Sequence, residues 1–439
     1  MQLFYENEML CDNMKIKNVK KEVSLEKAIF CGGMLISIAA FLVAAVQTRG
    51  VVLQNLFFGN PRDTFMDFFN VVICGKMPYT MQMIYPPLCH AILSFVGYFM
   101  PAALLKDGGF AVRESQIGMG VFFGWMMILL YVFFRVFRKM YCSSLRDSEN
   151  HFVTDIVLFC VLFSAPFIFC FERGNIIFLA LICLMIYIQW YQSENILLRL
   201  IAFTALAVSA GIKVYPAILG LLLIREKKWK QASLLVVMGA VVFFSPFLLM
   251  VGENRSVFKL LSNIEYTTGL YSTIGYGFRH DLVNQFNILS TLLNRDLTAV
   301  GSAVSLAIGL YGILLIFAEK DMERWKVLAI LISLMVLLTG FNYTYSLIYL
   351  VIPLIYFMND RSEDCRFVRI VYAVLFVLIF MPVIVYSGKD ILDPAYNGSW
   401  PLRIPAVIEN CALILLLLTI FVSETIRLIH GFTSKKRNK

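Results

Sequence analysis

The sequence predicts an all-α protein that crosses a membrane many times, and two observations lead to this class. Apolar residues make up 59% of the 439 residues and charged residues only 15%, whereas soluble domains carry roughly 25% charged residues. Apolar stretches of the roughly 20 residues that a helix needs to cross a bilayer recur along the chain. They leave no room for a large soluble domain, so we expect one integral membrane domain over residues 1–439.

About twelve transmembrane helices are expected from these apolar stretches. They are residues 28–46, 117–137, 152–170, 174–191, 197–211, 214–224, 232–251, 298–318, 327–340, 344–358, 367–386 and 404–428. The stretch 86–105 is equally apolar but is interrupted at Gly97 and Pro101. Whether this stretch crosses the membrane decides the orientation of every later span.

The basic residues set that orientation. The net charge of +9 comes from short clusters between apolar segments, which argues against a nucleic-acid partner, because such binding needs an exposed basic face. If 86–105 does not cross, the basic clusters from Arg135 onward share the cytoplasmic side with the N-terminal lysines, as the positive-inside rule requires. We therefore predict a re-entrant or surface-lying helix pair over 86–105 and cytoplasmic termini.

Two long segments then face outward, residues 47–116 and 252–297, and the functional residues are sought there. In the first, which we expect to be helical, Asp63 and Asp67 are four residues apart and share one face of a helix. A carboxylate pair at a membrane surface is a candidate general base. The alternative is that both are solvated acids or helix N-terminal charges.

Three further polar groups fall on the outer ends of predicted spans. Glu172, Arg173 and Asn175 lie between two spans, where the free N–H groups of the second helix favour an anion; the alternative is an arginine that snorkels to lipid headgroups. Lys213 and Tyr215 interrupt an apolar run of nearly thirty residues. A lysine at such a position is costly unless it pairs or reaches water, so it is a functional candidate; the alternative is a lysine that merely marks a turn.

The remaining polar residues are ambiguous. Arg279 and His280 follow a glycine- and tyrosine-rich stretch, residues 266–278, that we expect either to move as a lid or to be an ordinary loop. Asn342, Tyr343 and Tyr345 occupy a short outer turn. Tyrosines are common at membrane interfaces without any catalytic function, and we assign this turn mainly to that aromatic belt.

Five short motifs, in this order, resemble those of the GT-C superfamily and specifically of glycosyltransferase family 87. They are DFFN at Asp67, GKMPY ending at Tyr79, YPPL beginning at Tyr85, RGN at Arg173 and KVYP at Lys213. The resemblance covers about the first half of the chain. It implies a GT-C-type fold and transfer of mannose from a polyprenyl-phosphate donor to a lipid or glycan acceptor, as in the building of cell-envelope glycans or glycolipids.

The resemblance also implies roles for individual residues. Asp67 corresponds to the catalytic base, and Asp63 aligns less clearly because three residues separate the two acids. We expect Lys213 and Arg173, with Arg279 and His280, to bind the donor phosphate. The expected substrate-binding residues are Glu172, Asn175, Tyr79, Tyr85, Tyr215 and Asn342. We expect no metal ion and no cofactor, because two basic side chains suffice for a monophosphate leaving group.

Two rival functions remain. A transporter or flippase of lipid-linked sugars also needs outward-facing cations, but it requires polar residues deep in its spans or at the inner face, and these are not predicted. A structural membrane subunit leaves Lys213 unexplained. The sequence therefore favours a multi-pass enzyme of a bacterial plasma membrane whose partners are the donor, the acceptor and membrane lipids.

Overall fold

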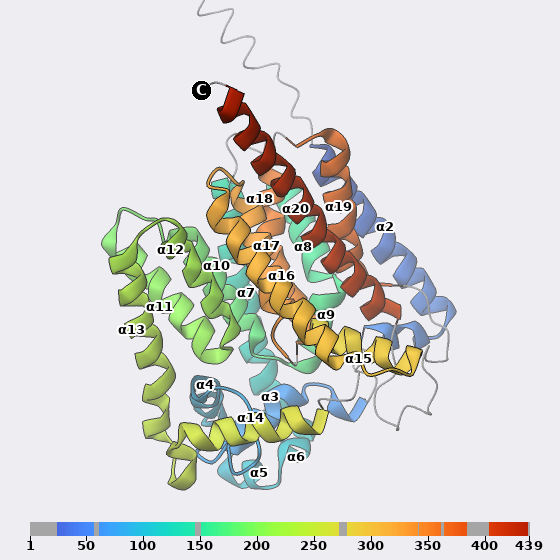
Figure 1. Ribbon diagram of the computed structural model, residues 1–439. Helices are drawn as coiled ribbons and strands as arrows, with labels where there is room; N and C mark the ends of the chain where they lie inside the picture. The colour runs from blue at the N-terminus through green and yellow to red at the C-terminus, as the bar shows by residue number, and fades with distance from the viewer. Residues whose placement is uncertain are drawn as a thin grey trace, which may run out of the picture.

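The computed structural model describes residues 24–56, 61–144, 151–271, 279–340, 342–360, 364–383 and 404–437. Within these residues the chain is helical, and its one extended pairing is an antiparallel bridge between Arg279 and Tyr343. The helices form a bundle with several short helices gathered at one end (Figure 1), which we call the loop end. Residues 1–23, with the N-terminal lysines Lys15, Lys17, Lys20 and Lys21, and residues 272–278 of the expected lid lie outside the described residues.

Five helices in the described part of the chain are long and apolar enough to cross a membrane. They are α2 (Leu25–Gln47), α7 (Gln116–Ser144), α13 (Trp229–Phe244) with its continuation η4 (Ser245–Leu249), α16 (Thr298–Ala318) and α20 (Ile404–Arg437). The pair α8 (His151–Leu162) and α9 (Ala165–Arg173) passes the same test together, although it is bent by 57°. The chain is therefore an all-helical, multi-pass membrane protein, as expected.

The other helices of the bundle are shorter. They are α10 (Ile177–Trp190), α11 (Ile196–Ile212), η3 (Tyr215–Gly220), α12 (Leu221–Arg225), α15 (Leu282–Leu293), α17 (Arg324–Leu337), η6 (Thr344–Leu350), α18 (Val351–Asn359) and α19 (Arg366–Phe380). Prolines stand in the first turns of α9 and η3, where the missing N–H costs no helical hydrogen bond. Each of the twelve expected spans overlaps a described helix, and the number that crosses a bilayer stays a prediction.

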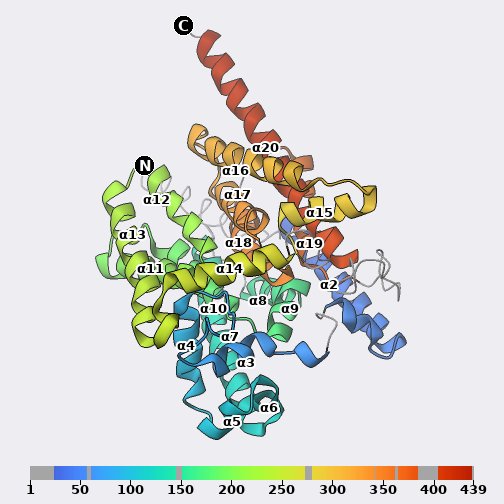
Figure 2. The same ribbon diagram turned by 60° about the horizontal axis from the view of Figure 1, so that its bottom comes forward.

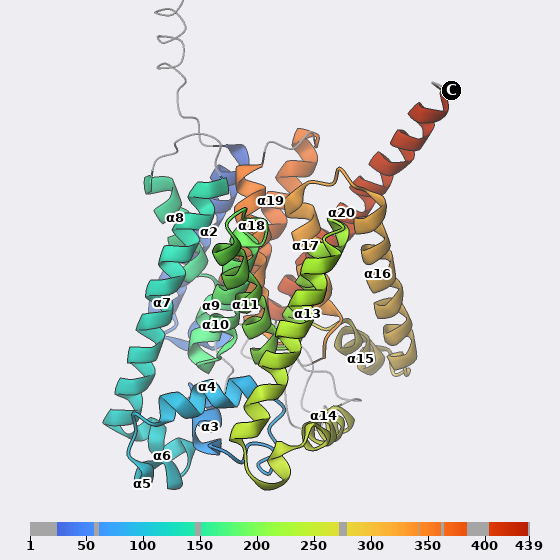
Figure 3. The same ribbon diagram turned by 90° about the vertical axis from the view of Figure 1, so that its left-hand side faces the viewer.

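The loop end is built from the two long segments that we expected to face outward. The first contributes η1 (Val51–Asn55), η2 (Pro61–Asp63), α3 (Met66–Cys74), α4 (Pro87–Gly97), α5 (Ala102–Lys106) and α6 (Gly109–Glu114), and the second contributes η5 (Gly252–Arg255) and α14 (Val257–Tyr271). The expected interruptions at Gly97 and Pro101 are confirmed, because α4 ends at Gly97 and Pro101 caps α5. Helices α4 and α14 lie across the ends of the longer helices (Figures 2 and 3).

Helix α17 lies at the centre of the bundle, where every residue from Trp325 to Leu337 is buried. Its first turn, at the end of the bundle away from the loop end, carries Lys326. The ammonium group pairs with carboxylates of Glu323, Asp364 and Glu424 at 2.8, 2.7 and 2.6 Å. A buried charge is tolerated only when it is paired in this way, so this cluster fixes α20 and the start of α19 against α17.

Candidate functional site

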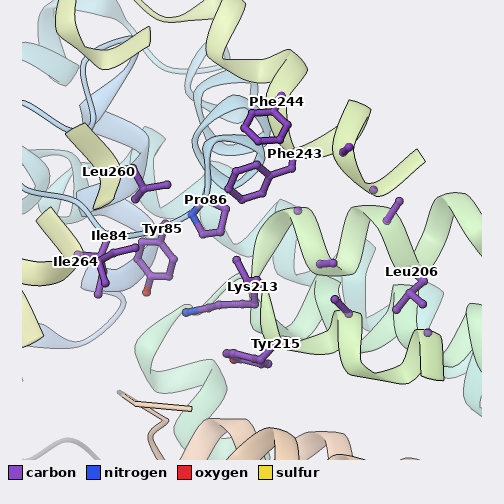
Figure 4. A pocket seen from close by; sticks show the side chains of 18 of the residues that line it. Ile84, Tyr85, Pro86, Leu206, Lys213, Tyr215, Phe243, Phe244, Leu260 and Ile264 are labelled. Carbon is purple, nitrogen blue, oxygen red and sulfur yellow. The ribbon is translucent and has the colours of Figure 1, made fainter. Parts of the chain in front are cut away.

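A cavity of about 1010 Å³ lies between the loop end, which includes α14, and the helices α11 to α13. We call it the central cavity. Its polar end is lined by Asp67, Tyr85, Arg173, Lys213 and Tyr345. The rest is an apolar groove between α11, η3, α12 and α13, and α14 covers part of it. Figure 4 shows Lys213 reaching from the wall that carries Leu206 toward the wall that carries Ile84 and Tyr85.

Asp67 lies in the first turn of α3, which is attached to the end of α9. Arg173 forms an ion pair with Oδ1 of Asp67 and also donates to the Asp63 carbonyl at 3.0 Å. The Phe65 N–H donates to the Glu172 carbonyl at 2.7 Å. Because these contacts join two segments about a hundred residues apart, the direction of the Asp67 carboxylate is set by the end of α9.

Gly174 makes the turn after Arg173 possible. Its φ is +63°, which L side chains rarely adopt, and an added Cβ would come within 3.1 Å of the Phe68 Cβ and 3.3 Å of the Phe65 carbonyl. Any other residue type would adopt a strained φ here and would push its neighbours in α3 away by a few tenths of an ångström. The turn places Arg173 and Asn175 on the same carboxylate.

Asn175 holds the second oxygen of Asp67. Its Nδ2 donates to Oδ2 of Asp67 at 2.7 Å and to the Tyr85 hydroxyl at 3.3 Å, while its Oδ1 accepts the Ile177 N–H at 3.0 Å. The last bond fixes which end of the amide is the donor. The same bond occupies an N–H group of α10 that we had expected to be free for an anion.

Tyr85 connects the carboxylate to the cation of the cavity. Burial and the nearby charge of Asp67 raise the pKa of its phenol well above the usual value, so the hydroxyl stays protonated. Since the oxygen accepts from Asn175, the hydroxyl hydrogen is directed elsewhere and is able to donate to a ligand.

Lys213 follows α11 directly, at the break before η3. Its ammonium lies 4.1 Å from the centre of the Tyr85 ring and 5.8 Å from that of Tyr345. No carboxylate among the described residues lies within ion-pair distance of it. Aromatic faces attract a cation without forming an ion pair, and the Asp67 carboxylate at the same end is already paired with Arg173. Lys213 is therefore able to bind an anion at the polar end of the central cavity.

The walls at the loop end are joined by two asparagines that the sequence did not indicate. Asn254 accepts the N–H groups of Tyr79 and Thr80 at 2.6 and 2.9 Å. Asn263 of α14 donates to the carbonyls of Tyr79 and Met83 at 2.9 and 3.1 Å. These bonds hold α14 against the segment that leads to Tyr85.

The structure brings five of the twelve expected site residues together. Asp67, Arg173, Lys213, Tyr85 and Tyr215 all line the central cavity, and Asn175 contacts Asp67 from behind. The sequence interpretation missed Tyr343 and Tyr345, which line the cavity, because a tyrosine pair in an outer turn is also typical of an aromatic belt. From the sequence we expect a groove for the lipid tail bordered by 86–105 and 252–297. Pro86 and residues of α14 do line the groove, whereas its walls from α11 to α13 were not predicted.

The other expected site residues do not line the cavity. Asp63 contacts Arg173 through its backbone carbonyl, and Glu172 accepts from Thr64 at 3.1 Å. Tyr79 is fully buried and donates to the Tyr85 carbonyl at 3.3 Å. The Asn342 side chain donates to the last carbonyls of α17. Arg279 and His280 belong to a separate buried cluster, described below.

Comparison with known proteins gives one match. The model of glycosyltransferase family 87 matches residues 84–340, which is more than half of the chain. The match includes Tyr85, Arg173 and Lys213, whereas Asp67 and Tyr345 lie outside it. No curated protein and no solved structure matches the chain.

Proposed function

This chain belongs to glycosyltransferase family 87, a membrane family of the GT-C type, and we propose that it transfers mannose from a polyprenyl-phosphate donor to a hydroxyl group of a lipid or glycan. The observation that carries the proposal is the central cavity. It joins a carboxylate and an ammonium group at one end to a long apolar groove. A lipid-linked phosphosugar has a matching part for each of them: the sugar for the carboxylate, the phosphate for the ammonium group and the lipid tail for the groove.

The groove fits the lipid tail of such a donor. Along α13 its lining runs from Ala232 to Phe244, a length of about 18 Å at the helical rise per residue. One leaflet of the hydrocarbon core is about 15 Å deep. Val236 and Phe244 line the groove and are both exposed, so the groove is open along α13, and we propose that the lipid chain enters there.

The reaction follows from the polar end. The acceptor hydroxyl attacks the anomeric carbon of the sugar and forms the new C–O bond, while the bond from that carbon to the phosphate oxygen breaks. The phosphate leaves with the bonding electrons, and Asp67 takes the hydroxyl proton. Lys213 and the Tyr85 hydroxyl stabilise the negative charge that develops on the phosphate.

Arg173 and Asn175 orient the base in this mechanism. Each holds a different oxygen of Asp67, which fixes the carboxylate plane while leaving further lone pairs for the acceptor hydroxyl. Because its guanidinium is engaged with Asp67, we assign Arg173 mainly to this role. Lys213 remains as the principal cation for the phosphate.

The basic residues support an extracytoplasmic active site. Arg138, Arg225, Lys228 and Arg324 lie at helix ends away from the loop end, and the positive-inside rule assigns such an end to the cytoplasm. We therefore propose cytoplasmic termini, an outward-facing cavity and a bacterial plasma membrane. A flippase is the less favoured alternative, because family membership supports a transferase and the cavity has charged residues at one end only.

The direct test is transfer by the purified protein in liposomes that contain radiolabelled polyprenyl-phosphate-mannose and a lipid extract as acceptor. Labelled product is the expected result. Transfer from a different polyprenyl-phosphate sugar would change only the identity of the transferred sugar in the proposal. Failure with every such donor, together with movement of the donor between leaflets, would overturn the proposal in favour of a flippase.

A substitution at Gly239 tests whether the groove holds the lipid tail of the donor. This residue lines the groove on α13, and a Cβ there would meet no atom within 4 Å. Gly239→Leu should therefore fold and extend into the space for the tail. Displacing roughly two methylene groups at ~0.8 kcal/mol each is expected to raise the donor KM about tenfold.

Gly124→Leu on α7 is the matched control, because an added Cβ there also meets no atom within 4 Å and Gly124 does not line the cavity. A donor whose chain is too short to reach Gly239 should be used equally well by all three proteins. Unchanged kinetics of Gly239→Leu with the long-chain donor would show that the tail lies elsewhere.

Transfer is also expected to persist in excess EDTA. The described residues contain no group of three or more His, Cys, Asp or Glu side chains placed to hold a metal ion, and Lys213 supplies the positive charge that a monophosphate leaving group needs. The measurement is the initial rate before and after chelation. A loss that added Mg²⁺ or Mn²⁺ restores would contradict a metal-independent mechanism.

A further inference from the structure

A second group of buried polar residues lies next to the central cavity without lining it. The His280 cluster, as we call it, consists of His280, Thr344, Glu409 and Asn410, and each of these residues is at most 5% exposed. His280 Nδ1 lies 2.8 Å from Asn410 Oδ1 and Nε2 lies 3.1 Å from Thr344 Oγ1. The cluster therefore joins the start of α15, η6 and α20.

Both ring nitrogens of His280 contact polar side chains of other segments. Asn410 Nδ2 donates to the Arg279 carbonyl at 3.3 Å, so its Oδ1 faces Nδ1 and accepts from it. Thr344 donates to Glu409 Oε2 at 3.3 Å, and the same carboxylate oxygen lies 3.4 Å from Nε2. The neighbouring Arg279 is engaged by Asp281 at 2.9 Å, so His280 and Arg279 contact different carboxylates.

Thr344 connects this cluster to the cavity wall. Tyr343 and Tyr345 on either side of it line the central cavity, while the Thr344 hydroxyl contacts His280 and Glu409. The backbone on either side is fixed as well, because His280 N–H donates to the Asn342 carbonyl at 2.8 Å and Arg279 pairs with Tyr343. The ring of Tyr345 lies 5.8 Å from the ammonium of Lys213.

We propose that His280, Thr344 and Glu409 are positioning residues that hold Tyr343 and Tyr345 in the wall of the central cavity and thereby set the affinity for the donor. Two of the three, Thr344 and Glu409, lie beyond the region matched by the family model. The inference rests on the proposed function, because it takes the cavity as the donor site. It gives the last third of the chain a role in substrate binding.

The test replaces Thr344 by valine, which keeps the shape of the side chain and removes its hydroxyl, and by serine, which keeps the hydroxyl. Loss of the bond to the buried His280–Glu409 pair is expected to raise the donor KM about tenfold while kcat changes little. Thr344→Ser should restore most of the wild-type KM. Thr154→Val, at another buried threonine on α8, controls for the loss of a hydroxyl elsewhere.

A merely structural role gives a different result. It would lower the amount of folded enzyme and hence the maximal rate of Thr344→Val at an unchanged KM, and that outcome would overturn the inference. Equal KM increases in the valine and serine variants would overturn it too, because the hydroxyl would then be irrelevant. If the wild-type protein shows no transfer at all, the proposed function fails first, and binding of polyprenyl phosphate to wild type and Thr344→Val then decides the positioning role separately.

Discussion

Replacement of Asp67 by asparagine is expected to lower the rate of sugar transfer by about 10²- to 10⁴-fold, the usual contribution of a general base. Asparagine keeps an oxygen that accepts from Arg173 and keeps the size of the side chain, but it does not take up a proton. The donor KM should stay within a few-fold of wild type, because Lys213 and the groove are unchanged. The measurement is initial rate at saturating donor, normalised to the monodisperse protein recovered after solubilisation.

Asp63→Asn is the control that separates a base from a nearby acid. Asp63 contacts Arg173 through its carbonyl oxygen at 3.0 Å, which the substitution retains, and its side chain does not line the cavity. Its transfer rate should remain close to wild type. A large loss in Asp63→Asn with little change in Asp67→Asn would reassign the base to Asp63.

The helices could be predicted from the sequence because the bilayer acts on each span separately. The residues expected to cross at 298–318 form α16 over the same range, Thr298–Ala318. The interruption of 86–105 was also predicted correctly, since glycine and proline end helices through local backbone effects. Local composition determines these features, and no knowledge of packing is needed to find them.

Part of the candidate site could be predicted for a related reason. Lys213 stands out because a charge within an apolar run is costly, Arg173 because it lies between two spans, and Asp67 because it shares a helix face with Asp63. All three line the central cavity. Their partners did not stand out. That Arg173 contacts Asp67 depends on the turn at Gly174 and on the attachment of α3 to α9, which are contacts between distant segments.

Tyr345 and His280 also show that the sequence does not reveal contacts between distant segments. A role in the cavity wall was missed for Tyr345, and phosphate binding was expected of His280. Tyr345 was assigned to an aromatic belt because nothing in its neighbourhood in the sequence distinguishes a cavity wall from a membrane interface. His280 and Arg279 were expected to bind phosphate because they are polar residues in an outer loop. The structure places His280 against Glu409 and Arg279 against Asp281 in buried contacts, and neither residue lines the central cavity.

Replacement of Lys213 by methionine is expected to lower kcat/KM for the donor by about 10²- to 10³-fold, the typical cost of removing one stabilising group from the developing charge. The effect should appear in both KM and kcat, because the phosphate bears charge in the bound donor and gains more as it leaves. Lys213→Arg should retain part of the activity, since it keeps the charge but changes its position and hydrogen-bond geometry. Steady-state kinetics at several donor concentrations provides the measurement.

The melting temperature distinguishes the loss of activity in Lys213→Met from misfolding. The half-buried ammonium of Lys213 is held by aromatic rings and forms no ion pair among the described residues, and partial burial of a charge without an ion pair costs free energy. Lys213→Met should therefore keep or raise Tm while losing activity, the pattern of a group retained for binding. Lys76→Met is the matched control, because Lys76 is an exposed lysine of the first outer segment, 47–116, and does not line the cavity. Both its Tm and its activity should stay near wild type. A fall in the Tm of Lys213→Met in proportion to its activity would instead make Lys213 a structural residue and remove the cation from the proposed mechanism.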